Sequence, residues 1–282
     1  MKRIIINRKD LTKVKDEIRK GGANQLHVLA DFDRTLTKAF VEGEKTPSII
    51  SELRSKNYIS KLYSKKAHEL FKKYHPIEID VNIPKKEKNK KMYEWWKKHF
   101  ELLIKSGLNK THLDKIIENG KIQFRKGTGE FLDFLHEKDI PLVIISSAGL
   151  GKESISMFLE RQKRLYNNIY IISNEYEWDK SGNAVAVKEP IIHCMNKSEV
   201  SVKKLPVYND LKKRKNVLLL GDSLEDVGMV EGFAYDNLIK IGFLNENISE
   251  NLEKYQKIFD ILILYDGSMN YVNKLLKEIV GK

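Results

Sequence analysis

Two aspartates, Asp31 and Asp33, follow directly on the mostly apolar run Leu26–Ala30 (LHVLA). Such a run indicates a buried strand, and two carboxylates beside it carry a desolvation cost. Further along the chain, Ser147 follows the apolar run LVII closely, and Asp222 follows NVLLLG. A lone acid after a strand is more often a helix cap than a catalytic group. Acids and a hydroxyl at three strand ends instead indicate a shared site.

These side chains suit phosphoryl transfer assisted by a hard cation. Mg²⁺ prefers carboxylate, phosphate and water oxygens, and Asp31 and Asp222 can supply the carboxylates. A carboxylate such as that of Asp31 can also attack phosphorus and form an aspartyl-phosphate. Asp33 can reach the leaving-group side of the same phosphate, protonate the departing alkoxide and later deprotonate water. The hydroxyl of Ser147 and a lysine would bind the remaining phosphate oxygens.

The elements that must position these residues follow an α/β pattern. From residue 127 onwards, apolar runs of strand length alternate with amphipathic helical segments. The runs are uniformly apolar, which predicts a Rossmann-like parallel sheet with helices on both faces. In residues 41–125, apolar residues recur mainly at helical spacing. The sequence therefore predicts a helical block inserted after the first strand of the sheet.

Composition limits the class of protein. Of the 282 residues, 41% are hydrophobic and 32% are charged, which suits a packed core and is too apolar for a disordered chain. The single cysteine, Cys194, excludes an internal disulfide. No apolar run approaches the roughly 18 residues of a membrane span, so we expect a cytoplasmic protein. The net charge of +12 favours anionic partners or reflects solvated lysines, and composition leaves both open.

The motifs resemble those of a known family. DFDRTLT, SSAG and GDSLED resemble the first, second and fourth motifs of the haloacid dehalogenase-like hydrolases. The segments GGANQLHVLADFDRTLTK, HPIEID, MYEWWKKH, NKSE and LLLGDSLEDVGMVEG resemble the cytosolic 5'-nucleotidase III (pyrimidine 5'-nucleotidase) family, from about Gly21 to the C-terminus. The resemblance implies a haloacid dehalogenase-like catalytic core of residues 1–40 and 126–282. Residues 41–125 would form a helical cap domain that closes over the nucleotide.

The resemblance further implies an enzyme that uses Mg²⁺ to hydrolyse nucleoside 5'-monophosphates. On this likeness, Asp31 is the nucleophile and Asp33 is the general acid and base. The implied metal ligands are the carboxylates of Asp31 and Asp222 and the backbone carbonyl of Asp33. Asp226 would support the water shell of the metal.

The phosphate-binding residues are also implied by the resemblance. Ser147 and Ala148 match the second motif, although Ser146 precedes them, so the serine of the motif can be mistaken by one position. Lys197 matches the catalytic lysine of the third motif. Nothing else in the sequence distinguishes Lys197 from the many lysines that are ordinarily exposed.

Four residues of the implied cap are candidate base contacts. Glu78 matches a carboxylate that contacts the base in relatives, and it can accept a hydrogen bond from an exocyclic amine. Trp95 and Trp96 point about 100° apart on a helix, so one is expected in the core and the other can stack on a base. A tryptophan also suits a cationic base such as 7-methylguanine. His99 stands where relatives carry a small hydroxyl residue, which suggests altered base contacts or an altered pH profile.

Two other interpretations remain open from the sequence. A phosphatase of the same fold can act on another small phosphomonoester, such as phosphoserine, although the predicted cap residues favour a nucleoside. A basic RNA-binding protein is disfavoured because Asp31 and Asp33 are both intact. We expect a nucleoside monophosphate as partner, no membrane or stable nucleic-acid partner, and a monomer or weak oligomer. Base preference stays open, because cap contacts worth about 1–3 kcal/mol decide it.

Overall fold

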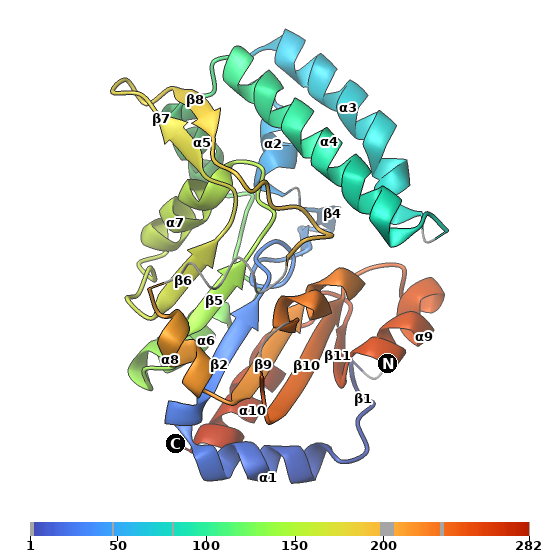
Figure 1. Cartoon of the computed structure of the whole chain (residues 1–282), viewed down its shortest axis with the longest axis vertical. Coiled ribbons are helices and arrows are strands. Elements are labelled where there is room, and N and C mark those ends of the chain that lie inside the picture. The colour runs from blue at the N-terminus through green and yellow to red at the C-terminus, as the bar shows by residue number, and fades with distance from the viewer. Residues whose placement is uncertain (1–2, 47, 81, 198–205, 232–233, 282) are drawn as a thin grey trace.

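A seven-stranded sheet forms the centre of the protein (Figure 1). The computed structural model describes residues 3–46, 48–80, 82–197, 206–231 and 234–281. Ser198 and Glu199 of the NKSE segment lie outside these ranges. In order across the sheet, the strands are β1 (Ile4–Ile6), β11 (Ile261–Leu264), β10 (Asn237–Leu244), β9 (Asn216–Gly221), β2 (Leu26–Ala30), β5 (Leu142–Ile145) and β6 (Ile169–Ile172).

Six of these strands run parallel, which confirms the predicted α/β fold, but one edge differs. β1 pairs antiparallel with β11, with Ile4 opposite Ile263. The sequence did not reveal β1 because three isoleucines are too few to show a period. Its partner strand also lies near the other end of the chain. The sheet is therefore mostly, not wholly, parallel.

The parallel strands are apolar along their length because helices cover both faces of the sheet. In β2, Val28 and Ala30 face one core while Leu29 between them faces the other. The first core is completed by α1 (Leu11–Gly21), α6 (Thr128–Glu137), α7 (Gly151–Arg161) and α10 (Asn270–Val280). The second is completed by α8 (Tyr208–Lys213), the 3-10 helix η3 (Leu224–Val230) and α9 (Ile248–Ile258). A further 3-10 turn, η1 (Ala23–Gln25), leads into β2.

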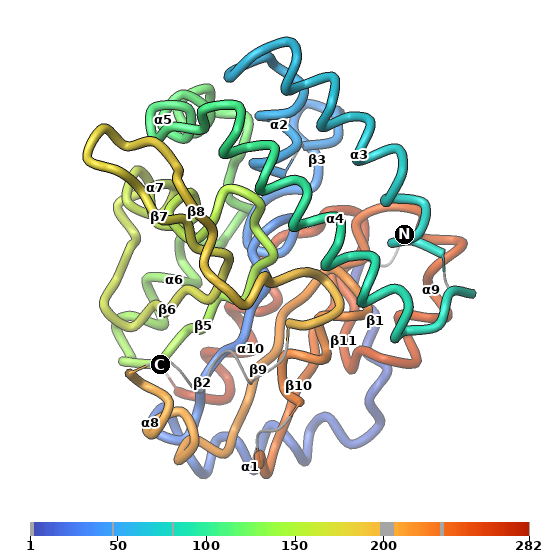
Figure 2. Tube along the Cα trace, turned by 45° about the horizontal axis from the view of Figure 1, so that its top comes forward, coloured from blue at the N-terminus to red at the C-terminus, as the bar shows by residue number. Residues whose placement is uncertain are grey.

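A block of helices lies beyond the end of the sheet toward which the parallel strands point (Figures 1 and 2). Its helices are α2 (Ile49–Ser55), α3 (Lys61–Ile79), α4 (Lys85–Lys105) and α5 (Lys110–Glu118). The block is not wholly helical, because a small hairpin of β3 (Phe40–Val41) and β4 (Glu44–Lys45) precedes α2. Within the described ranges, none of the helices combines the length and apolar character needed to cross a membrane.

A second hairpin, β7 (Tyr176–Trp178) and β8 (Ala184–Val187), packs on this helical block although it follows β6 in sequence. The N–H of Ala184 donates to Leu108 O at 2.8 Å, and that of Lys110 donates to Gly182 O at 3.0 Å. The hairpin therefore braces the loop between α4 and α5.

The segment after β9 forms the 3-10 helix η3. A capping box starts it: the Ser223 side chain accepts the N–H of Glu225 at 3.2 Å, and the Asp226 side chain accepts that of Ser223 at 2.9 Å. A Cβ placed on Gly221 would lie 2.5 Å from the Cβ of Asp226. The strand end and the first turn of η3 can approach this closely because residue 221 is glycine.

Candidate active site

The carboxyl ends of three strands bring the predicted catalytic residues together. β9, β2 and β5 are neighbours in the sheet, and Asp222, Asp31 and Ser146 are the residues that follow them. Asp31 extends the ladder by one residue, since its N–H donates to Leu220 O at 3.0 Å. Parallel strands end at one edge, so side chains distant in the sequence meet there.

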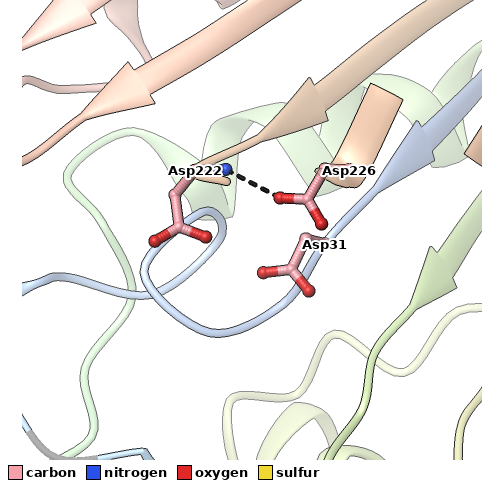
Figure 3. Close-up of side chains that lie close together, drawn as sticks. All are labelled: Asp31, Asp222 and Asp226. Carbon is pink, nitrogen blue, oxygen red and sulfur yellow. Dashed lines mark hydrogen bonds between the residues drawn. The ribbon is translucent and has the colours of Figure 1, made fainter. Parts of the chain in front are cut away.

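Three carboxylates form the centre of the site (Figure 3). Carboxylate oxygens of Asp31, Asp222 and Asp226 all lie within 4.8 Å of one another. Asp31 and Asp226 are buried and Asp222 is half-buried. The Oδ2 atom of Asp226 accepts the backbone N–H groups of Asp222 at 3.1 Å and Ser223 at 2.9 Å. These two bonds fix the carboxylate of Asp226 against the end of β9.

Lys197 brings a positive charge into this cluster. Its side chain is buried, and Nζ donates to Asp31 Oδ1 at 2.5 Å and to Asp226 Oδ1 at 3.0 Å. Burial alone would lower the pKa of Lys197, but the charges of Asp226 and Asp31 raise it well above its usual value. A turn positions the lysine, because Asn196 Oδ1 accepts the N–H of His193 at 2.7 Å. The resemblance, not any local pattern, identified this residue.

The electrostatics of the cluster show an excess of negative charge. Burial, opposed by Lys197 and assisted by the charge of Asp226, raises the pKa of Asp31 to about 7. Burial and the charges of Asp31 and Asp226 also raise the pKa of Asp222 well above its usual value. The single positive charge of Lys197 thus does not balance the negative charges of the three carboxylates. A buried set of carboxylate oxygens in this state is suited to a hard divalent cation.

Asp33 lies on a tight turn beside the cluster rather than within it. Burial raises the pKa of its carboxyl to about 6, and its negative charge contributes to the raised pKa of Asp31. The next residue, Arg34, has a φ of +61°, which is uncommon for a residue other than glycine. The N–H of Arg34 donates to Thr37 Oγ1 at 2.8 Å. This hydrogen bond closes the turn that directly follows Asp33.

The loop after β5 presents Ser147 rather than Ser146. Ser146 is buried and its N–H donates to Ile172 O at 3.0 Å, which continues the sheet. Ser147 is half-buried, and Ala148 beside it is buried. Asn174 Nδ2 donates to the carbonyl of Ala148 at 3.3 Å. Of the two serines, Ser147 is the more exposed residue.

The two adjacent tryptophans of α4 differ in what they contact. Trp95 is buried inside the helical block, where its ring stacks on Tyr74 with the centroids 5.9 Å apart. Trp96 lies against the loop after β5, because a Cβ built on Gly149 would be 2.7 Å from Trp96 Cζ3. Trp96 therefore borders the loop that carries Ser147 and is half-buried against Phe100, whereas Trp95 is buried.

Glu78 and His99 occupy different environments. Glu78 is in the last turn of α3, and its Oε2 lies 2.9 Å from His75 Nδ1. Burial and then the charge of Glu78 raise the pKa of the Cys194 thiol, so Glu78 faces the segment that leads to Lys197. His99 is 2% exposed, with Nε2 3.1 Å from the Tyr63 hydroxyl. Burial lowers the pKa of His99 to about 3, and its assignment as a base contact stays a prediction.

A cavity of about 400 Å³ adjoins Lys197 between the helical block and the core. Ile83 and Lys88 line it from the helical block, Met195 from the lysine segment, and Leu224 from η3. Volumes of this size accommodate small organic ligands. Among the described residues that line it, Lys197 is the one that also contacts the carboxylate cluster.

Three supporting residues were missed by the sequence reasoning. The Tyr255 hydroxyl donates to the carbonyl of Asp222 at 2.7 Å. Asn174 supports the loop after β5, and Arg125 Nε donates to Thr35 O at 2.8 Å. All three reach the site from distant parts of the chain. A single sequence has no spacing or composition signal for such contacts.

Comparisons with known proteins agree with the observed fold. The pattern of the pyrimidine 5'-nucleotidase (UMPH-1) family matches residues 34–280. The 7-methylguanosine phosphate-specific 5'-nucleotidase of Mus musculus is 34% identical over 264 residues, which cover 93% of this chain and 87% of that protein. The crystal structure of cytosolic 5'-nucleotidase IIIB bound to cytidine aligns with a TM-score of 0.89 and 27% identity, over 99% of this chain and 94% of that one. A haloacid dehalogenase family hydrolase of Salmonella enterica serovar Typhi, 15% identical with a TM-score of 0.57, shares the fold over 93% of this chain and 74% of its own.

Proposed function

This chain belongs to the pyrimidine 5'-nucleotidase (UMPH-1) family and is a 5'-nucleotidase, and we propose that it hydrolyses nucleoside 5'-monophosphates through an aspartyl-phosphate on Asp31, with Mg²⁺ as cofactor. One observation carries this proposal. The Asp31 carboxylate lies at a strand end within 4.8 Å of two further carboxylates and 2.5 Å from a buried lysine. That arrangement suits a carboxylate that attacks phosphorus beside a bound cation.

The donor set of the cluster fits a magnesium ion. Asp31 and Asp222 would hold it with the backbone carbonyl of Asp33, and Asp226 would support its water shell. The raised pKa values of Asp31 and Asp222 favour this assignment, since they indicate uncompensated negative charge. Bound there, Mg²⁺ supplies positive charge that keeps the carboxylates ionised and offsets charge on the phosphoryl oxygens.

The chain's own residues then divide the chemistry between them. The Asp31 carboxylate attacks phosphorus as the bond to the 5'-oxygen breaks, and the departing alkoxide takes a proton from Asp33. Water next attacks the phosphorylated Asp31, gives its proton back to Asp33, and releases phosphate. A pKa of about 6 suits Asp33 to both steps, because each protonation state is populated near neutral pH. Lys197 and Ser147 bind phosphoryl oxygens.

The helical block supplies the nucleoside contacts. We assign base stacking to Trp96, because it borders the loop that carries Ser147, and a polar base contact to Glu78. A relative is named for 7-methylguanosine phosphate and a solved neighbour holds cytidine, so both bases are candidates for this chain. Residues 41–125 would act as a cap that excludes water during the reaction.

The cellular setting is also part of the proposal. The solved neighbour is named a cytosolic enzyme, and Cys194 is a free thiol, which suits a reducing compartment. We therefore propose a cytoplasmic enzyme, acting as a monomer or weak oligomer.

Phosphate release from a panel of substrates tests the proposal. Purified protein is incubated with Mg²⁺ and CMP, UMP, AMP, GMP, 7-methyl-GMP or phosphoserine, and kcat/KM is compared. We expect at least one nucleotide to exceed phosphoserine, and Asp31→Asn to abolish turnover. Asp114→Asn, an identical change at an exposed position of α5, is the control and should retain activity. Hydrolysis that survives Asp31→Asn would refute the mechanism, and a preference for phosphoserine would refute the substrate class.

A further inference from the structure

Arg125 is a buried arginine that contacts the turn carrying Asp33. Its side chain is 1% exposed. Nε donates to Thr35 O at 2.8 Å, Nη2 donates to Arg34 O, and Nη2 also donates to Asn245 Oδ1 at 3.1 Å. The two carbonyls belong to the residues that directly follow Asp33. The guanidinium therefore binds the turn through hydrogen bonds to its backbone carbonyls, not to its side chains.

The conformation of this turn explains why it needs support. Arg34 has a φ of +61°, in the left-handed region that residues other than glycine rarely adopt. Its carbonyl accepts two donors, Arg125 Nη2 and Asn245 Nδ2, the latter at 3.1 Å. Uncommon backbone conformations persist only where surrounding contacts over-determine them, and they gather at functional sites. The residue held in this way is adjacent to the proposed acid and base.

The other edge of the guanidinium binds the loop after β11. Arg125 Nη1 donates to Gly267 O at 2.7 Å and lies 2.9 Å from Asp266 Oδ1. Asp266 in turn accepts the N–H groups of Ala39 at 2.9 Å and Phe40 at 3.0 Å. Those residues begin the passage of the chain from the core into the helical block.

Arg125 itself lies on the passage by which the chain returns to the core. The two passages are joined by backbone bonds, from Lys38 N to Gln123 O and from Arg125 N to Leu36 O, each at 2.9 Å. Arg125 thus belongs to the return passage, and its buried side chain contacts both the turn after Asp33 and the loop that binds the outgoing passage. Planar, five-donor recognition of this kind is specific to arginine.

We propose that Arg125 is a positioning residue, which holds the Asp33–Thr35 turn so that the Asp33 carboxyl faces the leaving oxygen and which ties that turn to both passages into the cap. The role rests on the proposed function, since it acts through Asp33 as general acid. Arg125 touches neither the three clustered carboxylates nor, on this view, the substrate.

The test compares leaving groups in Arg125→Met, Arg125→Lys and wild-type protein. A nucleoside monophosphate releases an alkoxide that needs a proton, whereas 4-nitrophenyl phosphate releases a stable phenolate that does not. We expect Arg125→Met to lower kcat/KM for the nucleotide by about 10- to 100-fold, with KM nearly unchanged, and for the aryl phosphate by less than about 3-fold. Arg125→Lys should recover part of the loss, because one charged donor remains.

Controls separate positioning from folding. Arg164→Met removes a partly exposed guanidinium that pairs with Asp133 at 2.9 Å. It should leave kcat/KM for both substrates unchanged. If Arg125→Met does not fold, Asn245→Ala removes one of the two donors to Arg34 O and should show the same selective loss, of smaller size. If Arg125→Met lowers kcat/KM equally for both substrates, or for neither, the positioning role is overturned. A wild-type protein that hydrolyses no nucleotide instead refutes the proposed function.

Discussion

The adjacent tryptophans of α4 allow a direct test, because the proposed function gives them different roles. We compare Trp95→Leu with Trp96→Leu, the same change at neighbouring positions of one helix. Trp95 is 6% exposed and stacks on Tyr74, whereas Trp96 lies against Gly149 in the loop that carries Ser147. The first change should therefore affect stability and the second should affect substrate binding.

The magnitudes follow from what each ring contacts. Removing a buried tryptophan to alanine costs about 3–5 kcal/mol, and leucine refills part of the space, so Trp95→Leu should cost about 2 kcal/mol of unfolding free energy. In a chain of this size that lowers Tm by roughly 3–4 °C. Loss of base stacking at Trp96 is worth about 1–3 kcal/mol, which raises KM by roughly 5- to 150-fold. Stacking on the base is uniform binding, so kcat should stay nearly constant in Trp96→Leu.

Thermal unfolding and steady-state kinetics with the best nucleotide measure both effects. The rings of Trp95 and Trp96 are themselves stacked, with centroids 6.0 Å apart, so a small KM change in Trp95→Leu is expected. The reasoning fails if Trp95→Leu raises KM more than Trp96→Leu does. It also fails if Trp96→Leu lowers kcat without changing KM, because the ring would then act on the reacting groups.

Three other predictions concern the cluster, the loop after β5 and the interior of the helical block. Lys197→Met should lower kcat/KM by about 100-fold or more, because it leaves Asp31 without its cation and, on the proposed mechanism, removes a donor to the phosphoryl oxygens. Initial rates at saturating Mg²⁺ measure this, and near-normal activity would contradict it. Gly149→Ala should raise KM for nucleotides, since its Cβ would lie 2.7 Å from Trp96 and displace the ring; a KM equal to that of wild type would show that the ring does not bind the base. The folded pKa of His99, about 3, lies below its unfolded value, so its contribution to stability is complete above about pH 6.5 and is lost as the pH falls, by roughly 2 kcal/mol at pH 5. Denaturation at pH 7 and pH 5 measures the change in unfolding free energy between the two pH values, which should be smaller in His99→Gln than in wild type. An equal change in both proteins would refute a neutral buried imidazole.

The catalytic strand ends could be predicted because local pattern and tertiary position coincide there. A parallel strand covered on both faces must be uniformly apolar, so the run LHVLA marks β2 and also marks Asp31 as the residue at its carboxyl end. The same logic places Asp222 after β9. Neither deduction required knowledge of the helices that cover the sheet.

Residues positioned by tertiary contact could not be predicted in this way. Helical geometry separates Trp95 from Trp96 by about 100° but does not say which faces the core, and the loop at Gly149 decides it. Lys197 has no local signal in a lysine-rich chain, and a family resemblance was needed to find it. Arg125 was missed altogether, because its partners come from three loops that are far apart in the sequence.

The charges around Asp31 also give an electrostatic reason for the proposed cation. Three ionised carboxylates and the single ammonium of Lys197 leave two unbalanced negative charges within a few ångströms. A phosphate monoester adds about two more, so the fully ionised site would repel its own substrate. Without metal, the raised pKa values of Asp31 and Asp222 relieve the imbalance by proton uptake, but a protonated Asp31 is not a nucleophile. Cation binding must therefore displace protons, and the apparent affinity for Mg²⁺ should fall as the pH is lowered below about 7.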